Sequence, residues 1–277
     1  MNLKKHNIEI IGNAVVKMEK IENLVVRLVG WKALLFYADP CVFDRWKWLQ
    51  HHLLPGPLRT FDAGCGSGVF TIYASKIGNQ SIGLSFEEKY INKARVQARL
   101  SGVKNIEFIK ADLRELHLLS DRLGVFDQII CFETIKHILD DKKVIRDLSN
   151  LLKPGGKLLL TTPFKYYKHL LGDKISEVED GGHVRWGYTH KELKDMFNEY
   201  GLDVCVQDYI SGYLSQQLTN LMRITGKVNK ILARVIVFPL RVFQIFDRPV
   251  TKLLKYPFHC VGIVGVKHSI NKEAKMI

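Results

Sequence analysis

Residues 61–68 read FDAGCGSG, and the rest of the fold can be worked out from them. They follow a short apolar stretch, LRTFDA at 58–63, and precede VFTIYASKI at 69–77, so the glycines join an expected strand to an expected helix. Glycine lets the backbone turn sharply and approach a ligand with no Cβ in the way. The N-terminus of the following helix favours negative charge through its free N–H groups. This G-x-G-x-G turn, preceded by an acid, therefore predicts a ligand site at the end of the first strand.

Strand-like and helix-like segments alternate from this turn to the end of the chain. The expected later strands are 80–85, 105–112, 126–132, 157–163, 202–210 and 260–268. The expected later helices are 87–102, 143–156 and 189–201. The last of these begins with Thr189, and Glu192 three residues on completes a capping box. Such alternation is typical of an α/β fold, and we expect a Rossmann-like, mostly parallel seven-stranded sheet with helices on both faces.

The chain divides into four parts on this pattern. Residues 1–57 are an N-terminal segment with helical spacing from residue 13 to 54, and residues 58–212 form the α/β core. Residues 213–256 are an α-helical insertion between the last two strands, and residues 257–277 hold the last strand and the tail. No apolar run is long enough for a secretory signal or a bilayer span, and the five cysteines show no metal-ligand or disulfide pattern. We therefore expect a cytoplasmic protein without a metal site.

Four segments of the core are more informative in their order along the chain than any one of them is alone. They are DAGCGSG at 62–68, Ala111-Asp112 after the third strand, FDQIICFE at 126–133 and LKPGGKLLL at 152–160. Together they resemble the class I S-adenosylmethionine-dependent methyltransferases over roughly residues 58–210. The resemblance implies S-adenosylmethionine as the cofactor and methyl transfer as the reaction.

The resemblance also implies which residues bind the cofactor. The methionine and sugar part would be lined by residues of the glycine turn, namely Asp62, Gly64, Cys65, Gly66 and Gly68. Asp62 would help to hold the ammonium group, and Asp112 with Leu113 would meet the adenine. Phe132 and its two neighbours at the end of the fourth strand would form the floor of the pocket beneath the sulfonium.

The end of the second strand departs from the family pattern. Many members carry an acid there that accepts both ribose hydroxyls, whereas this chain has Ser85. A serine makes one neutral hydrogen bond in place of a charged bidentate one. Either Glu87 reaches the ribose instead, or cofactor affinity is lower. In a further alternative, Ser85 only caps the following helix.

Candidate catalytic residues follow the fourth strand. Methyl transfer needs donor and acceptor to be aligned, and it needs a base only if the acceptor must lose a proton. Glu133 and His137 are spaced i, i+4 in FETIKHI, so they would share one face if this segment were helical. His137 could transfer a proton near neutral pH. The alternative is a structural histidine that fixes the loop after the strand.

A second set lies in GGHVRWGYTHKEL at 181–193. In the resembled family this stretch often covers the acceptor. His183 is a further candidate base, and Arg185, Trp186 and Tyr188 are candidate acceptor-binding residues. Arg185 could pair with a carboxylate or a phosphate on the acceptor. The alternative is an ordinary loop that uses its aromatic residues as packing anchors.

The net charge of +13 is unevenly distributed. Residues 61–212 hold 21 basic and 21 acidic residues, whereas residues 213–256 hold eight basic residues and one acidic residue. On one helix ending near Phe238, where Pro239 should kink it, five cations would share an arc of about 60°. They are Arg223, Lys227, Lys230, Arg234 and Arg241, and the opposite side would carry Leu214, Leu221, Thr225, Val228, Leu232 and Val235.

A basic stripe opposite an apolar face predicts contact with a membrane surface. The alternative is a helix pair packed on the protein's own core or in a dimer. Nucleic acid is an unlikely partner because the core around the cofactor is neutral. The leading hypothesis is thus a methyltransferase for a small-molecule or lipid-linked acceptor, peripheral on the inner membrane face. The rivals are an RNA or protein methyltransferase and a non-catalytic cofactor-binding module. The acceptor atom and the oligomeric state stay open.

Overall fold

The computed structural model describes residues 20–268. Its sheet has seven strands in the order β3-β2-β1-β4-β5-β7-β6. The strands are β1 Arg59–Ala63, β2 Gln80–Ser85, β3 Ile106–Lys110, β4 Phe126–Phe132, β5 Leu152–Pro163, β6 Leu202–Ile210 and β7 Cys260–Lys267. All pairings are parallel except those of β7, which runs antiparallel to both β5 and β6. The expected Rossmann-like, mostly parallel sheet is confirmed.

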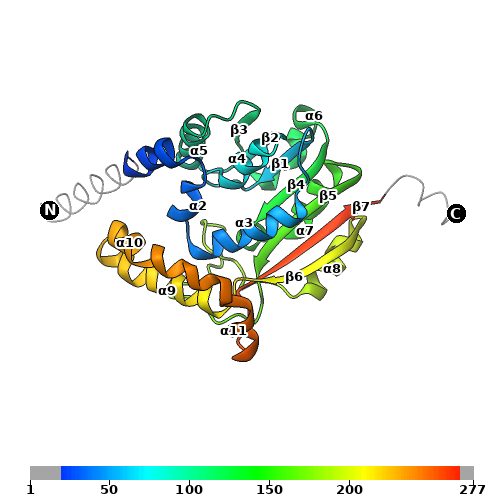
Figure 1. Cartoon of the computed structure of the whole chain (residues 1–277). Helices are drawn as coiled ribbons and strands as arrows, with labels where there is room; N and C mark the ends of the chain where they lie inside the picture. The colour runs from blue at the N-terminus through cyan, green and yellow to red at the C-terminus, as the bar shows by residue number, and fades with distance from the viewer. Residues whose placement is uncertain (1–19, 269–277) are drawn as a thin grey trace, which may run out of the picture.

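Helices cover both faces of this sheet (Figure 1). One face is covered by α3 Pro40–His52, α4 Val69–Lys76 and α5 Glu88–Leu100. The other face is covered by η1 Leu113–Leu119, α6 Ser120–Leu123, α7 Asp141–Asn150 and α8 His190–Glu199. Their apolar side chains bury the two sides of β1, β4 and β5, which explains why FDQIICF is apolar on both faces. The capping box of Thr189 and Glu192 at the start of α8 is confirmed.

The N-terminal segment is helical where it is described. A helix over residues 20–29 precedes α2 Ala33–Tyr37 and α3, and residues 13–19 of the expected helical stretch lie outside the described residues. The break at Asp39-Pro40 starts α3. The Asp39 side chain accepts a hydrogen bond from the Cys41 N–H at 2.8 Å, and Pro40 takes the first helical position.

The expected α-helical insertion between β6 and β7 is present, but it is not one long helix. It consists of α9 Tyr213–Val228, α10 Lys230–Leu240, η3 Arg241–Phe246 and α11 Asp247–Leu253. The chain breaks at Asn229, whose backbone is extended and whose side chain accepts from Ile231 N–H and Leu232 N–H. Pro239 lies in the last turn of α10, and the chain passes into the 3-10 helix η3 at Arg241, so the expected interruption near Phe238 occurs two residues later.

The basic stripe expected on one helix is wrong, because its residues are divided among α9, α10 and η3. Arg223 lies on α9 and pairs with Asp173, while Arg234 and Arg241 donate to backbone carbonyls in residues 35–38. These three arginines fasten the insertion to the core, and two of them, Arg223 and Arg234, line a cavity together with Lys227 and Lys230. The insertion's one acid, Asp247, accepts the N–H groups of Gly212, Leu214 and Ser215, and so caps the start of α9.

From α10 to α11 most of the buried side chains of the insertion are polar, and most of its large exposed side chains are apolar. The buried side carries Ala233, Val237, Arg241, Gln244, Asp247 and Thr251. The outward side chains are Val235, Phe238, Val242, Phe243, Ile245, Phe246, Leu253 and Leu254, which we call the outer apolar face. Each of these eight is between 52% and 81% exposed, an arrangement that costs free energy in water.

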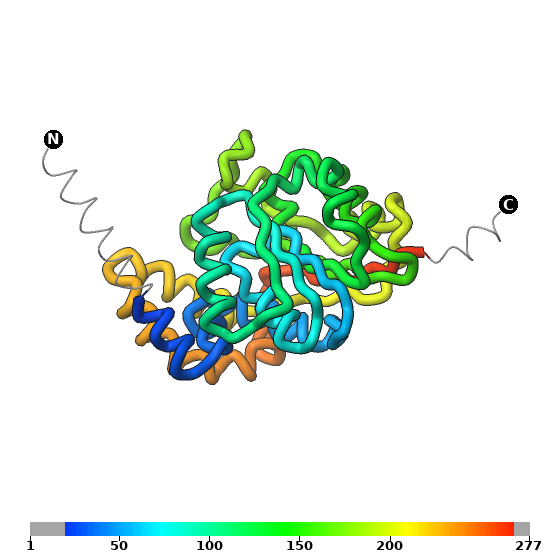
Figure 2. The backbone as a smooth tube through the Cα atoms, turned by 90° about the horizontal axis from the view of Figure 1, so that it is seen from above, coloured from blue at the N-terminus to red at the C-terminus, as the bar shows by residue number. Residues whose placement is uncertain are grey.

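The insertion stands at the edge of the sheet where the parallel strands end. Ile210 and Cys260 are partners in the β6–β7 ladder, so the insertion leaves and re-enters the sheet at one place. Because β6 runs in the same direction as β4 and β5, that place is the carboxyl edge. Figure 2 shows α10 beside the N-terminal helix at this side of the molecule. Within residues 20–268, no helix is both long enough and apolar enough to span a bilayer.

Candidate active site

The glycine turn after β1 has the backbone that its sequence predicts. Gly64, Gly66 and Gly68 have φ values of +89°, +50° and +82°, a region that only glycine adopts freely. A Cβ on Gly64 would lie 2.2 Å from the Thr134 Oγ1, so the turn packs directly on the segment after β4. A Cβ on Gly66 would meet no atom within 4 Å. The turn is thus tightly supported from behind and open at Gly66, which fits the close approach of a cofactor.

The first turn of α4 adds backbone donors to this opening. Gly68 occupies the N-cap position and supplies no side-chain cap, while Asp62 accepts from the Thr71 N–H in the first turn. The free N–H groups and the helix dipole favour an anionic group there, such as the carboxylate of an amino acid. The Cys65 thiol is turned away and buried, and it donates to the Gly66 carbonyl.

Asp62 lies behind the turn. It is 1% exposed, and the Thr71 hydroxyl donates to its carboxylate at 2.6 Å. Burial raises the pKa of Asp62 to about 7, although the hydrogen bonds from Thr71 oppose the shift. The Thr71 hydroxyl occupies one acceptor site of Oδ2, so the carboxylate keeps further acceptor sites. In the structure Asp62 joins the end of β1 to α4.

β2 ends at Ser85, so no acid stands at the strand end where many family members bind the ribose. Ser85 is buried, and its carbonyl accepts from the Ala111 N–H. The alternative that Ser85 caps α5 is wrong, because the N-cap residue is Glu87 and no side chain bonds there. The Glu87 carboxylate lies 2.5 Å from the Lys89 ammonium group at the surface. Phe86 between them is 63% exposed, and no sequence pattern marked it.

Asp112, which was expected to contact the adenine, forms its contacts within the protein. It caps η1 by accepting from the Arg114 N–H at 2.9 Å, and it forms an ion pair with the Arg114 guanidinium. Arg114 also reaches Glu179 at 2.6 Å, so the loop after β5 is tied to this position. The pKa of Asp112 is lowered, chiefly by the hydrogen bond from Arg114. Leu113 next to it is buried in the core.

The residues after β4 form a buried polar centre. Phe132 packs between Phe70 and Trp48, beneath the glycine turn. Glu133 has a left-handed backbone with φ +58°, and only Ile135–His137 form a 3-10 turn. The expected helical face shared by Glu133 and His137 is therefore wrong, since Glu133 lies outside any helix.

Two cations surround the Glu133 carboxylate. Its oxygens lie 2.8 Å from the Lys136 ammonium and 3.7 Å from the Arg45 guanidinium. Burial alone would raise the pKa of Glu133, but Lys136 and Arg45 outweigh it and hold the pKa well below its usual range. A carboxylate held ionised in this way is a poor proton acceptor and a good charge partner.

His137 and His183 meet, although 46 positions apart in the sequence. Their ring centroids are 5.0 Å apart, and the His137 Nδ1 lies 2.8 Å from the Gly182 carbonyl oxygen. A carbonyl only accepts, so Nδ1 carries the proton and Nε2 keeps a lone pair. Burial lowers the pKa of both rings, that of His183 to about 4. Both are neutral at pH 7, and the buried His183 Nδ1 has no hydrogen-bond partner within residues 20–268.

The three candidate acceptor-binding residues divide into two groups. Arg185 forms an ion pair with Asp141 and donates to the carbonyls of residues 138 and 139. The buried Tyr188 hydroxyl donates to the same Asp141 at 2.5 Å. These contacts support the anchoring alternative for both residues. Trp186 is half-buried and stacks on His169 with ring centroids 3.6 Å apart.

A chain of buried contacts leads away from Glu133. The sequence did not indicate it. The Cys260 thiol donates to Glu133 at 3.4 Å, and it lies 2.9 Å from the His259 Nδ1. The His259 ring packs edge-on against Tyr167, whose hydroxyl donates to Asp173 at 2.6 Å. These residues come from β7 and from the loop after β5. Their separation in the sequence hides the cluster, and only the antiparallel placement of β7 brings them together.

Comparison with known proteins agrees with this geometry. The profile of the methyltransferase domain family matches residues 57–226, more than half of the chain. A ubiquinone biosynthesis O-methyltransferase of Xanthomonas axonopodis pv. citri is 30% identical over 118 residues, which cover 43% of this chain and 48% of that protein. One of Bordetella avium is 32% identical over 121 residues, with the same coverage. The chain thus spans about half the length of the curated relatives it matches.

Solved structures share the fold at low identity. The phosphoethanolamine N-methyltransferase 2 of Haemonchus contortus has a TM-score of 0.56 and 18% identity, covering 82% of this chain and 52% of that one. The YcgJ protein of Bacillus subtilis has a TM-score of 0.55 and 18% identity, covering 82% of this chain and 99% of that one. With the family profile and the open glycine turn, the conclusion is plain: the chain belongs to the methyltransferase domain family, a class I fold whose cofactor is S-adenosylmethionine.

Proposed function

We propose that this protein transfers a methyl group to a hydroxyl oxygen of a small or lipid-linked acceptor, and that it does so at a membrane surface. The observation that carries methyl transfer is the glycine turn, which is open at Gly66 and leads directly into the N-terminus of α4. The oxygen acceptor is suggested by the relatives, which are O-methyltransferases of ubiquinone biosynthesis.

The cofactor supplies a methyl group that its sulfonium has already activated. Gly64, Gly66 and the α4 N-terminus would hold its amino-acid end, with Asp62 and Cys65 supporting the turn from behind. At the ribose, Ser85 offers a single hydroxyl and Phe86 an exposed ring. The Asp112–Arg114 pair would border the adenine.

His137 is the best-placed base for the acceptor hydroxyl. It is neutral at pH 7, its Nδ1–H is fixed by Gly182, and its Nε2 is therefore ready to accept a proton. His183 packs against it and, with its pKa at about 4, is the weaker base of the two. Glu133 would act by holding Lys136 and Arg45 in place at the end of β4.

The outer apolar face supports attachment to a membrane. Eight large apolar side chains are exposed along α10, η3 and α11, and Arg248, Lys252 and Lys255 are exposed beside them. Apolar side chains can enter the acyl boundary while these cations meet anionic headgroups. This surface lies on the same insertion that borders the carboxyl edge of the sheet, so a bound membrane would present lipid-like acceptors close to the site.

Two measurements test the proposal. Calorimetry should give binding of S-adenosylmethionine at a 1:1 ratio, and its absence would overturn the enzyme hypothesis. Labelled S-adenosylmethionine should then transfer its methyl group to hydroxylated amphiphiles extracted into organic solvent. Transfer to RNA or protein alone would instead support a macromolecular acceptor.

A further inference from the structure

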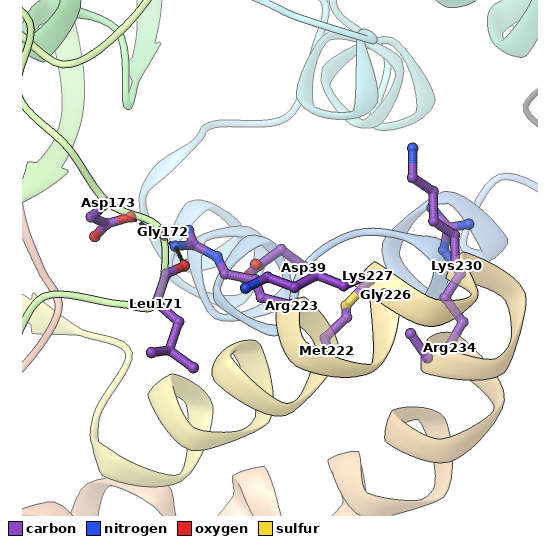
Figure 3. A pocket seen from close by; sticks show the side chains of 11 residues that line it. Asp39, Leu171, Gly172, Asp173, Met222, Arg223, Gly226, Lys227, Lys230 and Arg234 are labelled. Carbon is purple, nitrogen blue, oxygen red and sulfur yellow. Dashed lines mark hydrogen bonds and ion pairs between the residues drawn. The ribbon is translucent and has the colours of Figure 1, made fainter. Parts of the chain in front are cut away.

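A cavity of about 660 Å³ lies between the helical hairpin of the insertion and the loop after β5. Asp39 at the start of α3 closes one side, and Leu171, Gly172 and Asp173 close another. The hairpin contributes Met222, Arg223, Gly226, Lys227, Lys230, Ala233 and Arg234. The break at Asn229 makes this arrangement possible, because it folds α10 back so that cations from both helices line one space (Figure 3).

Most of the charged side chains that line this cavity are cationic. Four cations line it, against the two carboxylates of Asp39 and Asp173. The Asp39 carboxylate accepts hydrogen bonds from the Cys41 N–H and the Thr219 hydroxyl. The Asp173 carboxylate accepts from Tyr167 and Arg223. Lys227 and Lys230 are exposed. Within the described part of the chain, neither has a salt-bridge partner.

The position of Lys230 in its helix also favours binding of an anion in the cavity. Lys230 is the first residue of α10, where the helix dipole is positive and a cation is unfavourable. Lys227 lies three residues earlier, in the last turn of α9. The two ammonium groups that line this cavity are stabilised when an anion occupies it.

The cavity is also connected to the methyl-transfer centre. Arg223 donates to Asp173 at 2.7 Å, and Asp173 leads through Tyr167, His259 and Cys260 to Glu133 at the end of β4. An anionic group held by the hairpin would therefore lie on the same edge of the sheet as the proposed base. Arg185, the cation that the sequence suggested for this purpose, is instead committed to Asp141.

An apolar space adjoins the cationic one. It measures about 480 Å³ and is lined by Ile21, Val25, Val29, Ala33, Phe36, Tyr37, Ile231, Arg234, Val235 and Phe238. Arg234 lines both spaces. A ligand with a charged head and an apolar part would find complementary walls on the two sides of this residue.

From these observations we propose that the cationic cavity binds a phosphate monoester or diphosphate group carried by the acceptor. The inference rests on the proposed methyl transfer and adds the chemical class of the group that positions the acceptor. Lys227 and Lys230 would supply the main charge, and Arg223 would be shared with Asp173. The phosphate could belong to a soluble metabolite or to a lipid headgroup, and the experiment separates the two.

The test compares the full chain with Lys227→Gln/Lys230→Gln. The matched control is Lys76→Gln/Lys104→Gln, which removes two exposed lysines remote from the cavity. Calorimetry with pyrophosphate reports a soluble source. Flotation with phosphatidic acid vesicles, against phosphatidylglycerol vesicles of equal surface charge, reports a lipid source.

We expect at least tenfold weaker binding of one of these probes by the cavity variant, and a change of less than twofold in the control. Binding of pyrophosphate supports a soluble phosphorylated acceptor, and preference for phosphatidic acid vesicles alone supports a lipid. Equal binding by the two variants, or binding of neither probe by the wild type, overturns the site. A titration of the wild type with S-adenosylmethionine is read separately, so that failure of the cavity and failure of the proposed function are distinguished.

Discussion

The Asp173 Oδ1 lies 2.7 Å from the Arg223 Nη1, and this ion pair ties the loop after β5 to the helix α9. Asp173 is almost completely buried and also accepts from the Tyr167 hydroxyl. We expect Asp173→Asn to lower the free energy of unfolding by about 1–3 kcal/mol, because a buried charged hydrogen bond is lost. Denaturant unfolding measures this. A similar loss in Lys191→Gln, whose Asp195 pair is exposed, would contradict the assignment.

Gly66→Ala should weaken cofactor binding without unfolding the protein. The new Cβ would meet no protein atom within 4 Å, so it would project into the space that the cofactor should approach. Gly102→Ala is the matched control, because Gly102 has φ +65°, equally open surroundings and a position at the end of α5. We expect both variants to lose about 1 kcal/mol of stability. Only Gly66→Ala should raise the Kd for S-adenosylmethionine, and equal Kd values would argue against the site.

Asp62 should make stability fall as the pH rises. Its pKa is about 7 in the folded chain, whereas the usual value is 3.8, so between these values the folded state holds a proton that the unfolded state has lost. Stability therefore declines from pH 4 to pH 7, by about 2–4 kcal/mol from this group. Asp62→Asn should remove that contribution and be relatively more stable at pH 7.5 than at pH 4.5. Thermal melts of both proteins across this range measure the difference, and parallel curves would refute it.

His137→Asn should slow methyl transfer by about 10²–10⁴-fold if the ring acts as the base. The Kd for S-adenosylmethionine should stay within about twofold, since the ring is proposed to contact the acceptor. His51→Asn, at an exposed position on α3, is the control. For the wild type, kcat/KM should fall as the pH drops through the lowered pKa of His137, below the usual 6.5. An unchanged pH profile in the variant would assign the base to another group.

Leu253→Ser should weaken binding to anionic vesicles. Leu253 is 81% exposed on the outer apolar face, and its transfer into the acyl boundary should account for roughly tenfold in affinity. Leu118→Ser is matched to it, because Leu118 is 70% exposed on η1, outside this face. Flotation should separate the two variants. If both float like the wild type, the outer apolar face is covered by something other than lipid.

The α/β core could be predicted well because its signals are local. The apolar run FDQIICF, the left-handed glycines and the capping box of Thr189 and Glu192 each determine a structure within a few residues. The insertion was predicted poorly for the opposite reason. Helical spacing continues through Asn229, and the folded-back hairpin depends on the Asn229 cap and on the docking of Arg234 and Arg241 on residues 35–38.

In the candidate site, too, the locally determined features could be predicted and the long-range contacts could not. The sequence placed the glycine turn and the end of β4, but it could not show how their polar groups are paired. Arg185 could equally reach a ligand or a carboxylate of the protein, and its partner Asp141 lies 44 positions away. The pairing of Glu133 with Arg45 likewise depends on the packing of α3 at the sheet edge, which no motif records.

The pairing of Ile210 with Cys260 at the base of the insertion has an evolutionary consequence. The ends of the intervening 49 residues meet across neighbouring strands, so this segment can lengthen, shorten or be exchanged without altering the register of the sheet. A short turn would convert β6 and β7 into a simple hairpin. On the proposed function, in which the insertion positions the acceptor, a different segment grafted here would change the acceptor and leave the glycine turn untouched.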